Sequence, residues 1–295
     1  MAVMALSESR RRKLEMLTRC LAGGKVKDAQ AVIDALHTPS RVTGPALPVQ
    51  LAQAAPGIEQ HNAAGTYWLI RRPLLEVSAE LAGFPREYAA ILRGSRQRFD
   101  ELKASPALCH IANGLPDGPL FMDIETCGLA GCSIFLVGLM SFQGDELMFE
   151  QLLARHYGEE RAILAEFADR LAGSATLVTF NGKAFDMNSL RDRGAFHGVD
   201  LGFTPPHCDL LHESRRLWKG QVPNCKLQTL EQFFCRRRRV GDIPGRDIPD
   251  AYHRFVSGGD AREMTMILHH NLLDLLTMAQ LLCAALSGEQ PDLSA

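Results

Sequence analysis

Hydrophobic and polar positions between residues 118 and 153 form three short apolar blocks, which predict three successive β-strands. The blocks cover residues 118–126, 134–142 and 146–153. Each is too short for a core helix and is bounded by glycine, proline or aspartate, the residues that favour turns. Gln143, Gly144 and Asp145 join the second block to the third as a hairpin turn. The pattern therefore predicts an antiparallel β-meander.

The pattern on either side of the meander is mostly helical. Downstream it predicts an amphipathic helix at 159–171, a strand at 175–180, and helices at 207–219, 226–234 and 261–286. Upstream it predicts helices at 4–22, 26–36 and 86–102, a proline-rich linker at 38–57 and a strand at 65–72. We therefore expect an N-terminal extension of unknown role at 1–117, an α/β domain at 118–288 and a flexible tail at 289–295.

Composition excludes some classes of protein. The chain has 295 residues, 46% of them hydrophobic, and a net charge of -2, so it can bury a large core but is not a uniformly basic nucleic-acid coat. A local basic groove remains compatible with this charge. No run of about 18 apolar residues and no N-terminal signal segment is present. We expect a soluble, cytoplasmic protein with no membrane partner.

The eight cysteines are scattered and include no C-x-x-C pair. In a long chain without a secretion signal, this favours reduced thiols over a disulfide framework. A zinc site is the alternative, because thiolates and imidazole suit that metal. Its candidate ligands are Cys127 with Cys132, or His207, Cys208, Cys225 and Cys235.

Two acids end the first predicted strand. Side chains alternate faces along a strand, so Asp123 and Glu125 point the same way, opposite Met122 and Ile124. Two carboxylates this close in a half-buried place need a positive partner, and a metal ion with oxygen ligands is the usual one. The alternative is a strand that ends at Ile124, with both acids in water.

Two further acids fit the same site. Asp186 follows the strand at 175–180, at the sheet edge where open α/β folds bind ligands. Alternatively, Asp186 or Asn181 only caps the next helix. Asp274 lies on a mostly apolar helix face and needs a cationic partner. His270 is about 40° from Asp274 around the helix, whereas His269 is about 140° away.

These residues resemble, in order, the three motifs of the DEDD superfamily of 3'-5' exonucleases. The three segments are residues 123–126, 181–186 and 270–274. Residues 208–219, 225–227 and 242–245 are similar to a YprB-type ribonuclease-H-like domain. The resemblance covers about residues 118–286. It implies a ribonuclease-H-like mixed sheet, in which parallel strands extend the three-stranded antiparallel meander, flanked by helices and preceded by a mainly helical N-terminal extension.

The resemblance also implies a reaction. Asp123, Glu125, Asp186 and Asp274 would bind two divalent cations, Mg²⁺ or Mn²⁺, for phosphodiester hydrolysis. A fifth residue serves the attacking water: a His five residues before the last Asp, here His269, or a Tyr four residues before it, here His270. This sequence therefore departs from both patterns. We select His270, because it shares a helix face with Asp274, and keep His269 as the alternative.

The implied substrate is single-stranded DNA or RNA, and the sequence identifies no protein partner. We assign substrate binding to Thr126, Asn181, Arg215, Arg216 and Lys219. The arginines at 236–239 and Arg246 could extend a phosphate-binding groove, and Trp218 could stack a base. The alternatives are a solvated arginine face and a core tryptophan. A structure-specific endonuclease and a non-catalytic binding domain are the competing functions.

Overall fold

The computed structural model of the chain describes residues 48–112, 117–128, 131–202 and 204–293. The helices predicted at residues 4–22 and 26–36 lie outside the described residues. The described residues from Pro48 onward belong to one compact unit.

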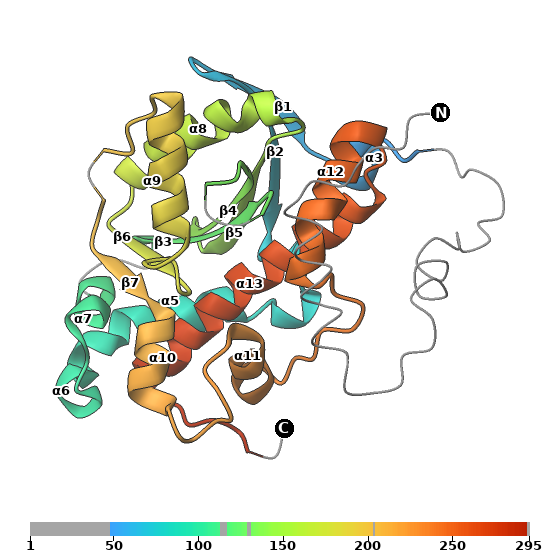
Figure 1. Cartoon of the computed structure of the whole chain (residues 1–295). Helices are drawn as coiled ribbons and strands as arrows, with labels where there is room; N and C mark the ends of the chain where they lie inside the picture. The colour runs from blue at the N-terminus through green and yellow to red at the C-terminus, as the bar shows by residue number, and fades with distance from the viewer. Residues whose placement is uncertain (1–47, 113–116, 129–130, 203, 294–295) are drawn as a thin grey trace, which may run out of the picture. The chain divides into compact units, whose positions relative to one another are not determined.

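A seven-stranded mixed sheet in the order β1-β2-β5-β4-β3-β6-β7 organises the described residues (Figure 1). β3, β4 and β5 form the predicted antiparallel meander, and β6 and β7 extend it in parallel. The predicted fold class is therefore confirmed. The strands are β1 (Ile58–Asn62), β2 (Gly65–Pro73), β3 (Pro119–Thr126), β4 (Ile134–Gln143), β5 (Glu146–Leu153), β6 (Thr176–Thr179) and β7 (His207–Asp209).

The pleat of β3 divides its side chains between two hydrophobic cores. Met122 and Ile124 belong to one core, and Phe121 belongs to the other. Asp123 and Glu125 have the same parity along the strand as Phe121, so they lie on its side of the sheet. Both carboxylates therefore face away from Met122 and Ile124, as predicted.

Helices cover both faces of the sheet (Figure 1). α8 and α9 pack on the face of Met122, while α5, α10, α11 and most of α13 pack on the face of Phe121. The longer helices are α5 (Phe84–Gly94), α7 (Pro106–Ala112), α8 (Glu160–Ala172), α9 (Asp186–His197), α10 (Leu210–Trp218), α11 (Leu227–Cys235), α12 (Ile248–Gly258) and α13 (Arg262–Ser287). Short turns of α-helix are α3 (Leu51–Ala54), α4 (Leu74–Val77) and α6 (Phe99–Leu102), and 3₁₀ turns are η1 (Ala79–Leu81), η2 (Ser95–Arg98), η3 (Tyr157–Glu159) and η4 (Gly245–Asp247).

α13 is the central helix of the core that contains Phe121. Among the described residues it is the one helix whose length and mean hydropathy, 1.2, would allow it to cross a membrane. However, 72% of its apolar window is buried against the rest of the protein. Its hydrophobicity is therefore that of a core helix packed between a sheet and other helices.

The predicted boundary at residue 118 does not separate two structural units. β1 and β2 form a hairpin, and β2 pairs with β5, so the upstream residues extend the same sheet. The compact unit that contains the sheet begins at Pro48. The tail predicted to be flexible is also attached: the Glu289 and Asp292 amides donate to Ala284 and Phe233 carbonyls.

Two other predictions differ from the structure. Residues 207–209, expected to begin a helix, form β7, since their backbone pairs with β6. α12 was not predicted at all. Of the two alternatives for Trp218, the core tryptophan is confirmed: the residue is 2% exposed, its ring packs on Phe234, and its Nε1–H donates to the Glu289 carbonyl.

Candidate active site

The carboxyl ends of the parallel strands meet at one edge of the sheet, where ligands bind in open α/β folds. Asp123 and Glu125 lie at this end of β3, which pairs in parallel with β6. Both side chains are only partly exposed. Glu125 makes no hydrogen bond or ion pair with the described residues, so its carboxylate is available to a ligand.

A tight turn connects β6 to α9 and presents the second motif. Asn181 has a left-handed backbone, with φ of 64°. Gly182 follows it, and a Cβ there would lie 2.4 Å from the Thr179 hydroxyl, so only glycine fits. Asp209 holds the turn by accepting hydrogen bonds from the amides of Asn181, at 2.8 Å, and Lys183, at 3.1 Å. The buried Asp209 carboxylate is thus a structural anchor for this loop.

Asp186 is the first residue of α9, directly after this turn. Neither Asp186 nor Asn181 caps the helix, because the capping position is Phe185 and has no side-chain hydrogen bond. Asp186 makes no hydrogen bond or ion pair with the described residues. The positive end of the α9 dipole favours a carboxylate here. The side chain is therefore positioned by the backbone alone and left available.

α13 brings Asp274 and His270 to the same site. His270 is nearly buried; its Nδ1 lies 2.8 Å from Asp242 Oδ2 and its Nε2 lies 3.5 Å from Asp274 Oδ2. His269 is exposed. Of the two candidate histidines, His270 is the one that contacts the acidic residues.

A close approach between α13 and β4 fixes Asp123. Asp123, Gly138 and Gln151 lie in one row across β3, β4 and β5. Asn271 sits over Gly138, where a Cβ would come within 2.0 Å of its Oδ1. Its Nδ2 donates to Asp123 Oδ2 at 2.8 Å, and its Oδ1 accepts from Gln151 Nε2 at 2.9 Å. The second bond fixes the amide orientation, so Asn271 presents a donor to Asp123.

The four predicted acids influence one another electrostatically. Burial, followed by the charges of Asp274, Glu125 and Asp186, raises the pKa of Asp123 well above its usual range. Burial and the charges of Asp274 and Asp186 do the same to the pKa of Glu125. Burial also raises the pKa of Asp274. The four carboxylates therefore lie near enough for their charges to act on one another.

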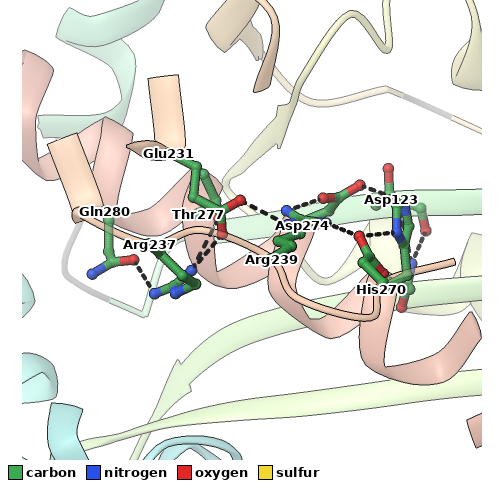
Figure 2. A network of polar contacts seen from close by, with 10 residues as sticks. Asp123, Glu231, Arg237, Arg239, His270, Asp274, Thr277 and Gln280 are labelled. Atoms are coloured by element: carbon green, nitrogen blue, oxygen red, sulfur yellow. Dashed lines mark hydrogen bonds and ion pairs between the residues drawn. The ribbon is translucent and has the colours of Figure 1, made fainter. Parts of the chain in front are cut away.

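Protein cations compensate part of this charge, as Figure 2 shows. Arg239, whose side chain is 5% exposed, donates to Asp274 Oδ1 at 2.5 Å and to Glu231 Oε2 at 2.7 Å. Arg237 donates to Glu231 Oε1 at 2.8 Å and to Gln280 Oε1. The two guanidinium groups therefore share the buried Glu231 carboxylate. This chain of polar contacts runs along α13 from Gln280 to His270 (Figure 2).

The donor set suits a hard divalent cation, because it consists of carboxylate oxygens. Glu125 and Asp186 have no partner among the described residues, and Asp242 Oδ1 is buried without a hydrogen bond. Within the same described residues, no three His, Cys, Asp or Glu side chains are gathered tightly enough to enclose a metal. The zinc set of His207, Cys208, Cys225 and Cys235 is therefore not assembled, and the four acids likewise do not form a tight ligand cluster. Asn271 and Arg239 instead hold two of the four acids.

The predicted substrate-binding residues come from different elements of the fold. Thr126 ends β3 and donates its hydroxyl to the Gly128 carbonyl at 2.6 Å. Arg215 and Arg216 are exposed on α10, about 9 to 11 Å beyond Asp209 at 1.5 Å per residue, and the exposed Lys219 directly follows this helix. Arg216 is paired with Glu213.

Sequence reasoning assigned no role to several residues that support the site. Asp242 contacts His270, and Asn271 contacts Asp123. Both lie in segments that carry the family resemblance, which was a usable signal. Asp209 also lies in such a segment, whereas Glu231 does not. Arg239 was expected only as part of a phosphate-binding groove, because periodicity cannot reveal its contact with Asp274, 35 residues away.

With this geometry established, comparison with known proteins identifies the class. A family model described as RNase_H superfamily matches residues 120–285. The match covers more than half of the chain, which therefore belongs to the RNase H superfamily. Within it, the chain is 36% identical over 166 residues to "Uncharacterized protein YprB" of Bacillus subtilis (strain 168). The match covers 55% of this chain and only 40% of that relative, and it supports a YprB-type RNase H-like domain.

Two solved structures are similar to part of the chain at low identity. One is a family B DNA polymerase from the archaeon Pyrobaculum calidifontis, with 18% identity, a TM-score of 0.44, and coverage of 55% of this chain and 24% of the polymerase. The other is the zinc-bound E. coli ExoI complex with single-stranded DNA, with 14% identity, a TM-score of 0.29, and coverage of 52% and 42%. Both TM-scores are below 0.5.

We expect the metal-free protein to lose stability as pH rises from about 4 to about 7. Burial and the charges of Asp209 and Asp274 raise the pKa of Asp186 to about 7, against about 3.9 for an unfolded aspartate. The folded state holds this proton more tightly, so deprotonation between the two values favours unfolding. Melting temperatures in EDTA at pH 5 and pH 8 should differ more for the wild type than for Asp186→Asn. Equal differences would contradict the expectation.

Proposed function

We propose that the protein is a metal-dependent nuclease that removes nucleotides from the 3' end of single-stranded DNA or RNA. The observation that supports this most directly is the convergence of Asp123, Glu125, Asp186 and Asp274, from three elements, at the carboxyl edge of the sheet. Crowded carboxylates are tolerable when cations neutralise them. Membership in the RNase H superfamily is consistent with this chemistry.

The four acids would hold Mg²⁺ or Mn²⁺. Bound divalent cations would lower the pKa of an attacking water and stabilise the charge that develops on the scissile phosphate. Glu125 and Asp186 would supply oxygens that no described residue uses. Asn271 keeps the Asp123 carboxylate in place, and Arg239 does the same for Asp274.

His270 would accept a proton from the attacking water. Its Nδ1 lies 2.8 Å from Asp242 Oδ2, and in the tautomer whose Nδ1–H donates to this carboxylate the free lone pair is on Nε2, the atom that faces Asp274. Nε2 would accept the proton at the edge of the acidic cluster. Asp242 is then a positioning residue, because it fixes the tautomer and the ring orientation without contacting the substrate.

The test uses linear single-stranded DNA and RNA oligonucleotides in Mg²⁺, Mn²⁺ or EDTA. A 5' label should give a descending ladder with either metal, whereas a 3' label should be released at once as a mononucleotide, and EDTA should stop both reactions. A circular oligonucleotide should stay intact. A cut circle would favour the endonuclease alternative. Binding that survives EDTA, without cleavage in either metal, would favour a non-catalytic binding domain.

A further inference from the structure

A polar pocket lies beside the acidic cluster, by which we mean the carboxylates of Asp123, Glu125, Asp186 and Asp274. Its volume is about 410 Å³, in the range of sites that hold small organic ligands. It is formed by one side of α11 and by the loop that follows this helix. The lining residues are Gln228, Glu231, Gln232, Arg237, Arg238, Arg239, Asp242, Ile243 and Pro244.

Three consecutive arginines, at 237–239, and two carboxylates, those of Glu231 and Asp242, line the pocket. Glu231 holds Arg237 with one oxygen and Arg239 with the other. Arg238, between them, is exposed and makes no hydrogen bond or ion pair with the described residues. The N–H donors of its guanidinium are therefore available to a ligand. A guanidinium is well suited to bind a phosphate, because two of its N–H groups can donate to two phosphate oxygens. The buried ion pairs on either side hold its backbone in place.

Two residues connect this pocket to the candidate active site (Figure 2). Arg239 lines the pocket and donates to Asp274, and Asp242 lines it and contacts His270. A ligand in the pocket would lie one side chain away from the acids. No such connection links the acids to the arginines of α10.

The remaining lining residues suit the other parts of a nucleotide. Gln228 and Gln232 are four residues apart and share a face of α11. Neither amide has a hydrogen-bond partner among the described residues, and each can donate and accept, as a base edge requires. Ile243 and Pro244 add an apolar wall. Enclosing a base in this way requires that it be unpaired, as in single-stranded recognition.

We propose that this pocket binds one nucleotide of a single-stranded substrate, adjacent to the nucleotide being cleaved, with its phosphate on Arg238. The inference rests on the proposed function and adds a substrate-binding site to it. It also assigns the phosphate contact to the loop after α11 instead of to Arg215, Arg216 and Lys219.

Fluorescence anisotropy with a labelled ten-nucleotide single strand in EDTA tests this without cleavage. Arg238→Gln should weaken binding about tenfold, as loss of one charge-assisted phosphate contact predicts. It should also reduce the slope of log K against log salt by about 0.7, the value for one phosphate on a single strand. Arg161→Gln, which removes an exposed arginine from α8 on the other face of the sheet, should bind like the wild type.

The outcomes separate this inference from the proposed function. If the wild type cleaves the strand but Arg238→Gln retains both affinity and salt slope, the pocket assignment is overturned and the nuclease stands. If the wild type neither binds nor cleaves any strand, both fall. Complete displacement of the strand by an equal concentration of a mononucleotide would also overturn the assignment, because the ligand would then be a free nucleotide.

Discussion

Asp186→Asn is expected to lower metal-dependent cleavage of a single-stranded oligonucleotide by about 10³-fold, the scale on which removing a preorganised charged group affects a hydrolytic enzyme. The substitution keeps the size of the side chain and removes its charge. Because Asp186 makes no hydrogen bond or ion pair with the described residues, the fold should be unaffected. Initial rates in saturating Mn²⁺, together with a melting temperature in EDTA, measure both effects.

Asp192→Asn is the matched control. Asp192 lies on the same helix, α9, but is exposed to solvent. Its loss should leave the rate within about twofold, since exposed charges beyond about 10 Å are screened at ordinary salt. Retention of more than a tenth of the wild-type rate by Asp186→Asn, with full Mn²⁺ dependence, would remove Asp186 from the metal-binding set.

Glu231→Gln is expected to destabilise the protein by about 3 to 5 kcal/mol, the usual cost of breaking a buried ion pair by removing one partner. Glu231 is 1% exposed and neutralises two guanidinium groups, one of them on Arg239, which is only 5% exposed. The variant would leave that positive charge with weaker compensation in a low-dielectric place. Urea unfolding followed by circular dichroism measures the change in the free energy of unfolding.

The control for this variant is Glu263→Gln. Glu263 makes two hydrogen bonds to Arg254, both at 2.7 Å, so the contact geometry is as good as that of Glu231. Both side chains are well exposed, however, and exposed pairs contribute at most about 1 kcal/mol. Similar losses in the two variants would show that the network around Glu231 behaves as a surface ion pair.

Local pattern was sufficient to predict the scaffold of the site. The apolar blocks gave β3, β4 and β5, and the two-residue period placed Asp123 and Glu125 on one side of β3. The helical period placed His270 and Asp274 on one face of α13. These predictions succeeded because each depends only on residues within a few positions of one another.

The pattern failed where a segment's structure depends on a distant neighbour. β7 is three residues long and exists because β6 lies beside it, so its sequence alone read as the start of a helix. The sequence pattern assigned the residues of β1 and β2 to a separate extension. In the structure β2 pairs with β5, so both strands extend the same sheet. Period and propensity carry no information about which strand lies alongside.

By itself, then, the sequence determined which residues are acidic, which faces they occupy and in what order the elements follow. The tertiary structure alone decided their partners: Asn271 with Asp123, 148 residues apart, and Arg239 with Asp274, 35 residues apart. It also decided that Arg238, and not the arginines of α10, lies beside the acidic cluster. The physical reason is that alternation and helical periodicity act along the chain, whereas ion pairs and close packing act through space.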